Sequence, residues 1–279
     1  MSTNTKYHLE TKEQRNIGTS EMPLSCCNGV HPSENLLQVS SIPSVWCVGC
    51  GIGTVVNTFI QTVERSDIDF NKICVVSGIG CTGKVAEYLN FTSYTTTACD
   101  LFEFAANVKS KNTSSRVVVF SNNADLLVSG AADFINSAGR DDDLIVIHIN
   151  NIVFTITEYG IVPASPFLRI SVDQNFVLPF NIPHLAESYG VRYIARWTPL
   201  RAGWLMYSIM DTFAKRGFSL IEVVSPCSIY CSASDTIGDS VEQMEFYDRH
   251  SVIRQGECTE NLDMRANNRI ILGKFVDKR

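Results

Sequence analysis

The chain has 279 residues, of which 45% are hydrophobic and 19% are charged, a composition typical of a globular protein with a core. Its 23 basic and 29 acidic residues give a net charge of −6 at pH 7, which excludes the basic surface of a general nucleic-acid binder. No apolar run approaches the roughly 20 residues of a membrane span, and no basic start precedes an apolar stretch as in a secretory signal. We therefore expect a cytoplasmic protein with no membrane span and no nucleic-acid partner.

Residues 1–30 are polar and lack a sustained apolar period, so we expect an N-terminal arm there and a single main domain over residues 31–279. From Trp46 onward, short apolar runs rich in β-branched residues alternate with segments of helical spacing. The runs lie at residues 73–76, 117–120, 144–147, 193–195 and 220–224, and the helical segments at 53–63, 130–138 and 200–215. Apolar strands separated by helices predict an α/β fold, a three-layer sandwich around a mostly parallel sheet.

Parallel sheets bind ligands in the loops that follow the carboxyl ends of their strands. Here those loops are residues 77–84, 121–125, 150–159 and 225–231. The first, second and fourth hold or adjoin small residues or a cysteine, and the third holds the pair Asn150-Asn151. His148 ends an apolar run, which indicates a hydrogen-bonded core histidine rather than a catalytic base.

Ten cysteines in a chain without a secretory signal indicate metal or redox chemistry more than disulfides. Cys47 and Cys50 form a C-x-x-C motif, which is consistent with a zinc half-site, a redox pair or two buried cysteines. Cys81 and Cys227 each follow a predicted strand, so both can approach that pair at one edge of the sheet. Four thiolates are what a [4Fe–4S] cluster requires, but buried core cysteines remain the alternative on spacing alone. Cys74 lies within a predicted strand and is expected in the core.

Several segments together resemble the thiamine-diphosphate-binding beta subunit of 2-oxoacid:ferredoxin oxidoreductases, most of all the 2-oxoglutarate type. The likeness covers residues 31–279 and is carried by His31-Pro32, Trp46-Cys47-x-x-Cys50-Gly51, Ser77-Gly78-Ile79-Gly80-Cys81, Tyr88-Leu89-Asn90-Phe91 and the stretch from Gly217 to Cys227. It implies a thiamine-diphosphate-binding fold. It also implies that Cys47, Cys50, Cys81 and Cys227 ligate one [4Fe–4S] cluster.

The resemblance implies oxidative decarboxylation of a 2-oxoacid of the 2-oxoglutarate or pyruvate class. Coenzyme A takes the acyl group, and electrons pass through the cluster to ferredoxin. A beta-type subunit lacks half of a thiamine site, so an alpha subunit is implied as partner. Lys84 matches a position that faces the oxoacid and suits a distal carboxylate, although a solvated lysine at a helix start is an equal reading.

The resemblance also assigns residues to thiamine diphosphate and Mg²⁺. The cofactor contacts would be Ile79, Gly80, Cys81, Thr82, Asn123, Ala124, Asp125, Asn151, Val153 and Thr155, and the Mg²⁺ ligands the side chains of Asn123 and Asn151 with the carbonyl of Val153. The family reads Gly-Asp-Gly-Asp where this chain has Asn122-Asn123-Ala124-Asp125, so a negative charge at the metal is lost.

Two further stretches depart from the family in the same pocket. Thr-His-Gly-Arg becomes Thr97-Ala98-Cys99-Asp100, and Gly-Met-Thr-Gly-Gly-Gln becomes the segment from Thr155 to Gly160. Asp100 and Glu158 add charge that repels a diphosphate. These changes support an alternative function, a non-catalytic paralogue that keeps the cluster and the partner interface with weak or no thiamine diphosphate binding.

Overall fold

The computed structural model describes residues 33–38, 46–47, 49–151, 153–157, 160–163, 181–227, 240–264 and 269–278. The arm predicted for residues 1–30 lies outside these ranges and stays a prediction. All the described residues belong to one compact unit, Ser33–Arg279. None of the described helices is long and apolar enough to cross a membrane.

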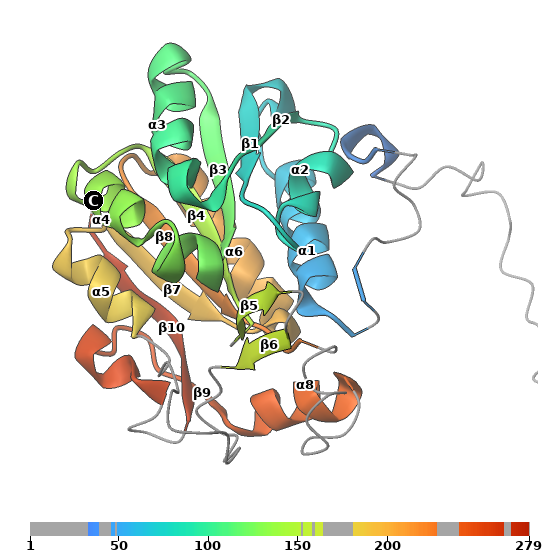
Figure 1. Cartoon of the computed structure of the whole chain (residues 1–279), viewed down its shortest axis with the longest axis vertical. Helices are drawn as coiled ribbons and strands as arrows, with labels where there is room; N and C mark the ends of the chain where they lie inside the picture. Colours follow the sequence, from blue (N-terminus) through green and yellow to red (C-terminus); the bar gives the residue numbers. More distant parts are fainter. Residues whose placement is uncertain are drawn as a thin grey trace, which may run out of the picture. The chain divides into compact units, whose positions relative to one another are not determined.

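An eight-stranded sheet forms the centre of this unit (Figure 1). Its strand order is β2-β1-β3-β4-β8-β7-β10-β9, and every pairing is parallel except that of β10 with β7. The strands are β1 (Ile73–Ser77), β2 (Thr92–Thr95), β3 (Arg116–Asn122), β4 (Leu144–Asn150), β7 (Tyr193–Trp197), β8 (Ser219–Val224), β9 (Ser251–Ile253) and β10 (Ile270–Asp277). A separate antiparallel pair is formed by β5 (Val153–Thr157) and β6 (Gly160–Pro163). The prediction of a mostly parallel sheet is confirmed.

Helices cover both faces of the sheet, as expected of a three-layer sandwich. The α-helices are α1 (Gly51–Arg65), α2 (Lys84–Tyr88), α3 (Leu101–Lys111), α4 (Ala131–Gly139), α5 (Ile182–Ser188), α6 (Ala202–Ala214) and α8 (Ser240–Arg249). The short turns of helix are η1 (Glu34–Leu36), η3 (Phe70–Lys72), η4 (Ala98–Asp100), η5 (Ala124–Val128), η6 (Pro199–Arg201) and η7 (Thr259–Leu262).

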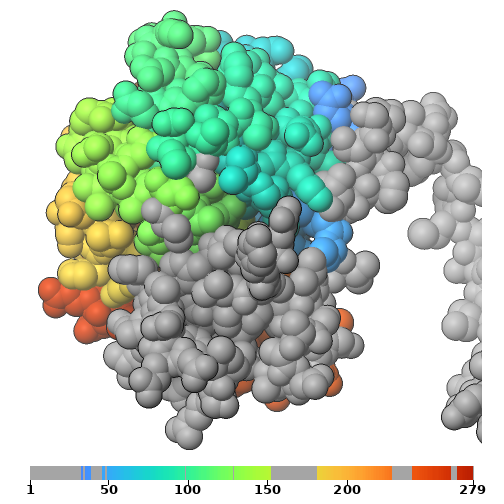
Figure 2. All heavy atoms as spheres, viewed as in Figure 1, coloured from blue at the N-terminus to red at the C-terminus, as the bar shows by residue number. Residues whose placement is uncertain are grey.

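Alternate residues of the central strands enter two separate cores, one on each face. Val75 and Val118 pack with α1 and α6, whereas Cys74 and Val117 pack with α3, α4 and α5. Figure 2 views the molecule from the side of α3, α4 and α5, whose atoms are coloured from green to yellow in chain order. Strands buried on both faces explain the continuous apolar runs in the sequence, and Cys74 is a core residue as predicted.

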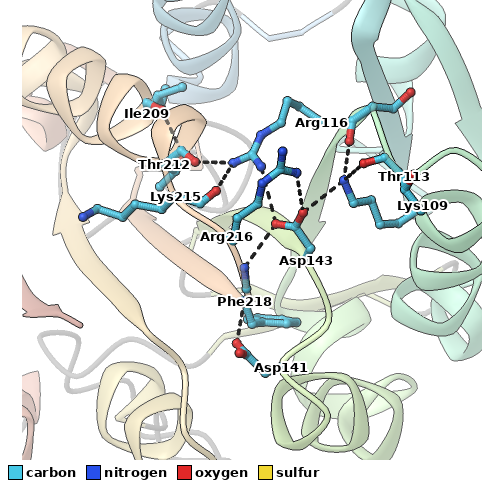
Figure 3. Close-up of polar contacts among 12 residues, drawn as sticks. Lys109, Thr113, Arg116, Asp141, Asp143, Ile209, Thr212, Lys215, Arg216 and Phe218 are labelled. Atoms are coloured by element: carbon cyan, nitrogen blue, oxygen red, sulfur yellow. Dashed lines mark hydrogen bonds and ion pairs between the residues drawn. The ribbon is translucent and has the colours of Figure 1, made fainter. Parts of the chain in front are cut away.

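A charge cluster closes the amino-terminal edge of the sheet, opposite the strand-end loops. The carboxylate of Asp143, just before β4, lies 3.0 Å from Nζ of Lys109, 3.5 Å from Nη1 of Arg116 and 3.0 Å from Nη1 of Arg216 (Figure 3). Arg116 also donates to the carbonyls of Thr212 and Lys215, where α6 ends. These bonds fix the starts of β3 and β4 and the end of α6, so this edge is structural and the opposite edge is available for chemistry.

Candidate functional site

The first cysteine pair lies at the N-terminus of α1. The backbone N–H of Cys50 donates to the carbonyl of Cys47 at 3.0 Å, and Gly49 has φ 78°, which a glycine adopts without strain. Cys47 is exposed and Cys50 half-buried, and α1 begins directly afterwards at Gly51. A backbone hydrogen bond therefore joins the two cysteines directly before a helix begins.

Trp46 connects this turn to the loop that carries Cys81. Its indole N–H donates to the carbonyl of Cys81 at 2.8 Å. Its ring packs edge-to-face on Tyr88, with the ring centroids 4.9 Å apart. Trp46 thus holds two cysteine-bearing segments together although they lie 35 positions apart in the chain.

Gly51 allows the segment that carries Cys227 to pack against the N-terminus of α1. A Cβ atom at Gly51 would lie 2.1 Å from Oγ of Ser225 and 2.5 Å from Cγ of Pro199, so only glycine permits this approach. Ser225 begins the short segment that ends at Cys227, which is half-buried. The N-terminus of α1 therefore packs directly on the strand-end loop that carries the fourth cysteine.

The four sulfur atoms are close enough for their charges to interact. Burial, together with smaller effects of Cys227, Cys81 and Cys47, raises the pKa of Cys50 to about 11 against an opposing hydrogen bond from the N–H of Ile52. Burial likewise raises the pKa of Cys81, with contributions from Cys227 and Cys47 and an opposing one from Lys84. Because metal binding needs thiolates, a cluster here would displace protons from buried thiols.

Within the described ranges, no three His, Cys, Asp or Glu side chains are arranged closely enough to form a metal site. The loops thus bring the predicted ligands into one region without bringing the sulfurs into ligand geometry. The donor set, four thiols from three segments at one edge of the sheet, nevertheless fits the chemistry of a [4Fe–4S] cluster.

Beside the cysteines, β3 ends in a turn that Asn122 organises. Its Oδ1 accepts the backbone N–H groups of Ala124 and Asp125 at 2.8 and 3.1 Å. Its Nδ2 donates to the carbonyl of Ile79 at 3.2 Å and to Oγ1 of Thr82 at 2.8 Å. The turn from Asn122 to Asp125, which opens η5, is therefore bound to the loop after β1.

Asp125 faces the same loop and not an open pocket. It is fully buried, and its Oδ2 accepts the backbone N–H of Asn122 at 3.0 Å. A Cβ atom at Gly78 would lie only 2.4 Å from this oxygen. Burial raises the pKa of Asp125 to about 6, against the hydrogen bonds from Asn122, Ile79 and Thr82.

Asn123, the predicted Mg²⁺ ligand, has its amide in the interior. It is 2% exposed, its Oδ1 lies 3.0 Å from Nε2 of His148, and its Nδ2 donates to Oδ1 of Asn150 at 3.0 Å. Nδ2 of Asn150 in turn donates to Oε1 of Glu222 at 2.7 Å, and Oε2 of Glu222 accepts from Nε of Arg196 at 2.6 Å. The predicted ligand is thus one member of a buried hydrogen-bonded chain.

The chemistry of Glu222 sets the direction of every bond in this chain. A carboxylate only accepts, so Asn150 presents its NH₂ to Glu222 and its oxygen to Asn123. Asn123 then offers its own oxygen to His148, which must carry its proton on Nε2. Nδ1 of His148 lies 3.0 Å from Oγ of Ser121 and accepts that hydroxyl proton.

His148 is accordingly a neutral core histidine, as the sequence predicts. Burial lowers its pKa to about 4, against an opposing effect of Glu222. The hydrogen-bonded chain from Ser121 to Glu222 fixes the carboxyl ends of β3, β4 and β8 beneath the turn from Asn122 to Asp125.

Sequence reasoning missed Arg196 and Glu222 although both stand out in apolar strands. Arg196 of β7 and Glu222 of β8 are register partners, and Glu222 is also the register partner of His148. The sequence does show a signal for these contacts: His148, Arg196 and Glu222 are each a polar or charged residue inside a largely apolar strand, β4, β7 and β8 respectively.

The remaining predicted cofactor residues surround the same strand ends. Ile79 is 54% exposed, Gly80 has φ 76°, Thr82 is buried and Asn151 is half-buried. Val153 and Thr155 lie in β5, which contacts η5. The turn η4, which contains Asp100, also contacts η5. Glu158 lies outside the described residues.

These positions do not fit Mg²⁺ equally well. Mg²⁺ prefers anionic oxygens, but the amide of Asn123 is engaged inside and the carboxylate of Asp125 faces Gly78. Ligation by Asn123, Asn151 and the carbonyl of Val153 stays a prediction that this geometry does not support.

Known proteins are similar to this chain over most of its length. The family of C-terminal TPP binding domains of thiamine pyrophosphate enzymes matches residues 78–223. The 2-oxoglutarate synthase subunit KorB of Methanothermobacter marburgensis is 33% identical over 250 residues, 88% of this chain and 87% of that protein. The 2-oxoacid:ferredoxin oxidoreductase subunit beta of Saccharolobus solfataricus is 29% identical over 212 residues, 73% of this chain and 66% of that protein.

A solved structure shares the fold. It is the 2-oxoglutarate:ferredoxin oxidoreductase from Magnetococcus marinus, with a TM-score of 0.74 and 18% identity, covering 88% of this chain and 85% of the matched one. The fold, the matched domain and the identities agree: this chain belongs to the beta subunits of 2-oxoacid:ferredoxin oxidoreductases, within the thiamine pyrophosphate enzymes.

Proposed function

We propose that this chain, with an alpha subunit, converts a 2-oxoacid and coenzyme A to an acyl-CoA and CO₂. The substrate is of the 2-oxoglutarate or pyruvate class. The bond between the carboxylate and the keto carbon breaks, the acyl group joins the sulfur of coenzyme A, and the thiol proton is released. Two electrons leave singly through a [4Fe–4S] cluster to two molecules of ferredoxin. This reaction suits a reducing, cytoplasmic compartment in which the thiols persist.

One observation carries this proposal: three cysteine-bearing segments meet beside the strand-end turn in a chain of this family. Cys47, Cys50, Cys81 and Cys227 would hold the cluster. The contacts of Trp46 and Gly51 hold their loops together before any metal binds.

Thiamine diphosphate, when bound, supplies the carbanion chemistry that allows CO₂ to leave. The residues proposed to line it are Ile79, Gly80, Cys81, Thr82, Asn123, Ala124, Asp125, Asn151, Val153 and Thr155. The buried chain from Ser121 to Glu222 keeps the strand ends beneath this site rigid and dry. We assign no step to Mg²⁺, because the amide of Asn123 is held by His148 and Asn150.

Lys84 is proposed to bind the distal carboxylate of the oxoacid. It is exposed at the first position of α2, and its charge lowers the pKa of Cys81 against burial, so it lies within electrostatic range of the cluster ligands. A cation there favours a dicarboxylic substrate such as 2-oxoglutarate.

A specific observation supports the second candidate, a non-catalytic paralogue. The turn offers neutral amides where a metal–diphosphate unit needs charge, and exposed Asp100 lies on η4, which contacts η5. Such a subunit would keep the cluster and the alpha-subunit interface and would relay electrons.

The two candidates are separated by cofactor content. The chain is co-purified with its alpha subunit without oxygen, and iron, acid-labile sulfide and thiamine diphosphate are measured per chain. About four iron atoms and about one thiamine diphosphate, followed by ferredoxin reduction with 2-oxoglutarate and coenzyme A, are expected of the enzyme. Iron without thiamine diphosphate, even with excess Mg²⁺ and cofactor, identifies the paralogue. Absence of iron refutes both.

A further inference from the structure

We propose that a cavity between α3 and the edge strand β2 binds an adenine nucleotide. The cavity has a volume of about 630 Å³, within the range of about 300–1,000 Å³ that is usual for small-molecule sites. It lies at the amino-terminal end of β1, whereas the cysteine loops follow the carboxyl ends of the strands. The five residues of β1 separate the two regions by about 16 Å. A ligand in this cavity therefore takes no part in the proposed reaction, and the inference does not depend on that function.

The cavity exists because α3 packs on β1 and β3 and leaves the edge strand β2 largely exposed (Figure 1). The ring of Phe104 on α3 lies edge-to-face on Tyr94 of β2, with the ring centroids 5.5 Å apart. Next to this contact, Cys74 of β1 and Thr92 of β2 are register partners, so their side chains point to the same face of the sheet. Both side chains are small, and the space between them and α3 stays open.

The apolar surfaces of the cavity fit a flat aromatic ring. Phe104 and Val108 lie four residues apart and so present one face of α3 to the cavity. Tyr94 lies opposite them on β2 and is 42% exposed, so part of its ring is available to a ligand. Ile73 and Cys74 line the same space and are otherwise buried. Aromatic side chains bind planar rings by offset or edge-to-face packing, so these surfaces favour a heteroaromatic base.

Three asparagine side chains on the rim favour adenine as that base. Nδ2 of Asn71 donates to Asp69, and Oδ1 of Asn112 accepts from Ser114, so each amide keeps its other end for a ligand. Asn107 has no side-chain hydrogen bond to any described residue and is exposed on α3. An asparagine amide can accept from the exocyclic NH₂ of adenine and donate to N7 of the same ring. The rim thus offers the donors and acceptors that the edge of adenine requires.

Lys111 supplies the charge that a phosphate group requires. It is exposed in the last turn of α3 and lines the cavity, and it forms no ion pair with a described carboxylate. The neighbouring Lys109 is instead committed to Asp143. None of the described residues that line the cavity is acidic. Since the C-terminal end of a helix disfavours an anion, the binding of a phosphate here must depend on the ammonium group of Lys111.

Titration calorimetry of the full chain with adenosine monophosphate (AMP) tests the proposal, and one AMP is expected to bind per chain. Asn107→Trp places an indole at the cavity and is expected to abolish binding. Ser110→Trp is its matched control, because Ser110 is exposed on the same helix and does not line the cavity. Lys111→Met is expected to raise the Kd about tenfold, the effect of losing one charge-assisted hydrogen bond. Lys278→Met, at an exposed lysine after β10, should leave the Kd unchanged.

Two analogues divide the ligand into its parts. Adenosine lacks the phosphate and is expected to bind about tenfold more weakly than AMP, which matches the effect of Lys111→Met. Ribose 5-phosphate lacks the base and is expected not to bind. A native chain that does not bind AMP overturns the proposal, as does AMP binding that persists in Asn107→Trp. Ribose 5-phosphate that binds as tightly as AMP overturns the assignment of adenine.

Cys74 gives a second measurement that needs no variant. Its thiol lines the cavity, and its alkylation by iodoacetamide is followed by mass spectrometry of peptides. At an AMP concentration about ten times the Kd, the alkylation rate of Cys74 is expected to fall about tenfold, because about one site in ten stays free. The exposed Cys258, which does not line the cavity, should react at an unchanged rate. A Cys74 rate that AMP does not change places the nucleotide elsewhere and overturns the proposal, even where Asn107→Trp fails to fold.

Discussion

Nε of Arg196 lies 2.6 Å from Oε2 of Glu222, and neither side chain is exposed. The two residues are register partners on β7 and β8, and Glu222 uses its second oxygen for the amide of Asn150. One ion pair therefore sets the direction of the hydrogen bonds that run from Glu222 through Asn123 to Ser121. A buried pair is costly to break, because each partner left alone is an uncompensated charge.

Replacing Glu222 alone is expected to be severe. Glu222→Gln leaves the charge of Arg196 buried without a counterion and is expected to cost about 3–5 kcal/mol in the free energy of unfolding. The exposed pair of Arg140 and Glu103 gives the control, since Glu103→Gln is expected to cost no more than about 1 kcal/mol. Urea denaturation of the metal-free chain measures both.

The double variant Arg196→Met/Glu222→Leu separates charge from packing. It removes both charges and keeps most of the volume, so it is expected to lose less stability than Glu222→Gln despite the missing acceptor for Asn150. A double variant less stable than Glu222→Gln contradicts the argument that the unpaired charge dominates.

His148 makes the free energy of unfolding of the protein depend on pH, and its lowered pKa gives the sign of this dependence. Its pKa is lowered from 6.5 to about 4 in the folded state, so below pH 6.5 the unfolded chain binds a proton that the folded chain does not. Its contribution to stability is therefore complete above pH 6.5 and is lost as the pH falls toward 4. The loss reaches about 3 kcal/mol at the lower end of this window.

Asp125 changes the free energy of unfolding with pH in the direction opposite to His148. The pH dependence of the native chain alone therefore does not isolate His148, and the difference between the native chain and a His148 variant must be measured. The pKa of Asp125 is raised from 3.8 to about 6, and the folded chain gains a proton as the pH falls through this range. His148→Gln can still donate to Asn123 and does not titrate. Subtracting its free energy of unfolding from that of the native chain at pH 7 and at pH 4.5 should isolate the histidine. A difference that does not change with pH is incompatible with a buried neutral His148.

The central strands could be predicted because burial on both faces leaves continuous apolar runs. β1, β3, β4, β7 and β8 all contain predicted runs. The edge strand β2 (Thr92–Thr95) is polar and largely exposed, so it carries no such signal. β10 is interrupted by Gly273 and Lys274, where its pairing with β7 becomes irregular.

The approach of the cysteine-bearing loops could be predicted, but the polar interior could not. Cys81 and Cys227 could be grouped because strand ends of a parallel sheet share one edge, whereas their role as cluster ligands stays a prediction. The orientation of Asn123 depends on His148 and Asn150 from the next strand, and the pairing of Arg196 with Glu222 depends on register. The spacing of residues along the sequence reveals neither the orientation of Asn123 nor the register between β7 and β8.

Lys84 is expected to determine the choice of oxoacid. Lys84→Met is expected to raise the KM for 2-oxoglutarate about tenfold with little change in kcat, because the lost interaction is with a distal carboxylate. Pyruvate lacks that group, so its KM should be nearly unchanged. Lys72→Met is the control, since Lys72 is an exposed lysine at the other end of β1. Equal effects on both substrates would rule out the assigned contact.

Gly51 is expected to be necessary for assembly of the cluster. In Gly51→Ala, the new Cβ meets Oγ of Ser225 and Cγ of Pro199 and must push the loop of Cys227 away from the turn of Cys50. The iron content per chain should fall well below that of the native complex, while the sheet and its far-ultraviolet circular dichroism are retained. Gly203→Ala on α6 is the matched control, because a Cβ there meets no atom within 4 Å and alanine favours a helix. Full iron content in Gly51→Ala would show that the contact between α1 and Ser225 does not set the distance between the cysteine loops.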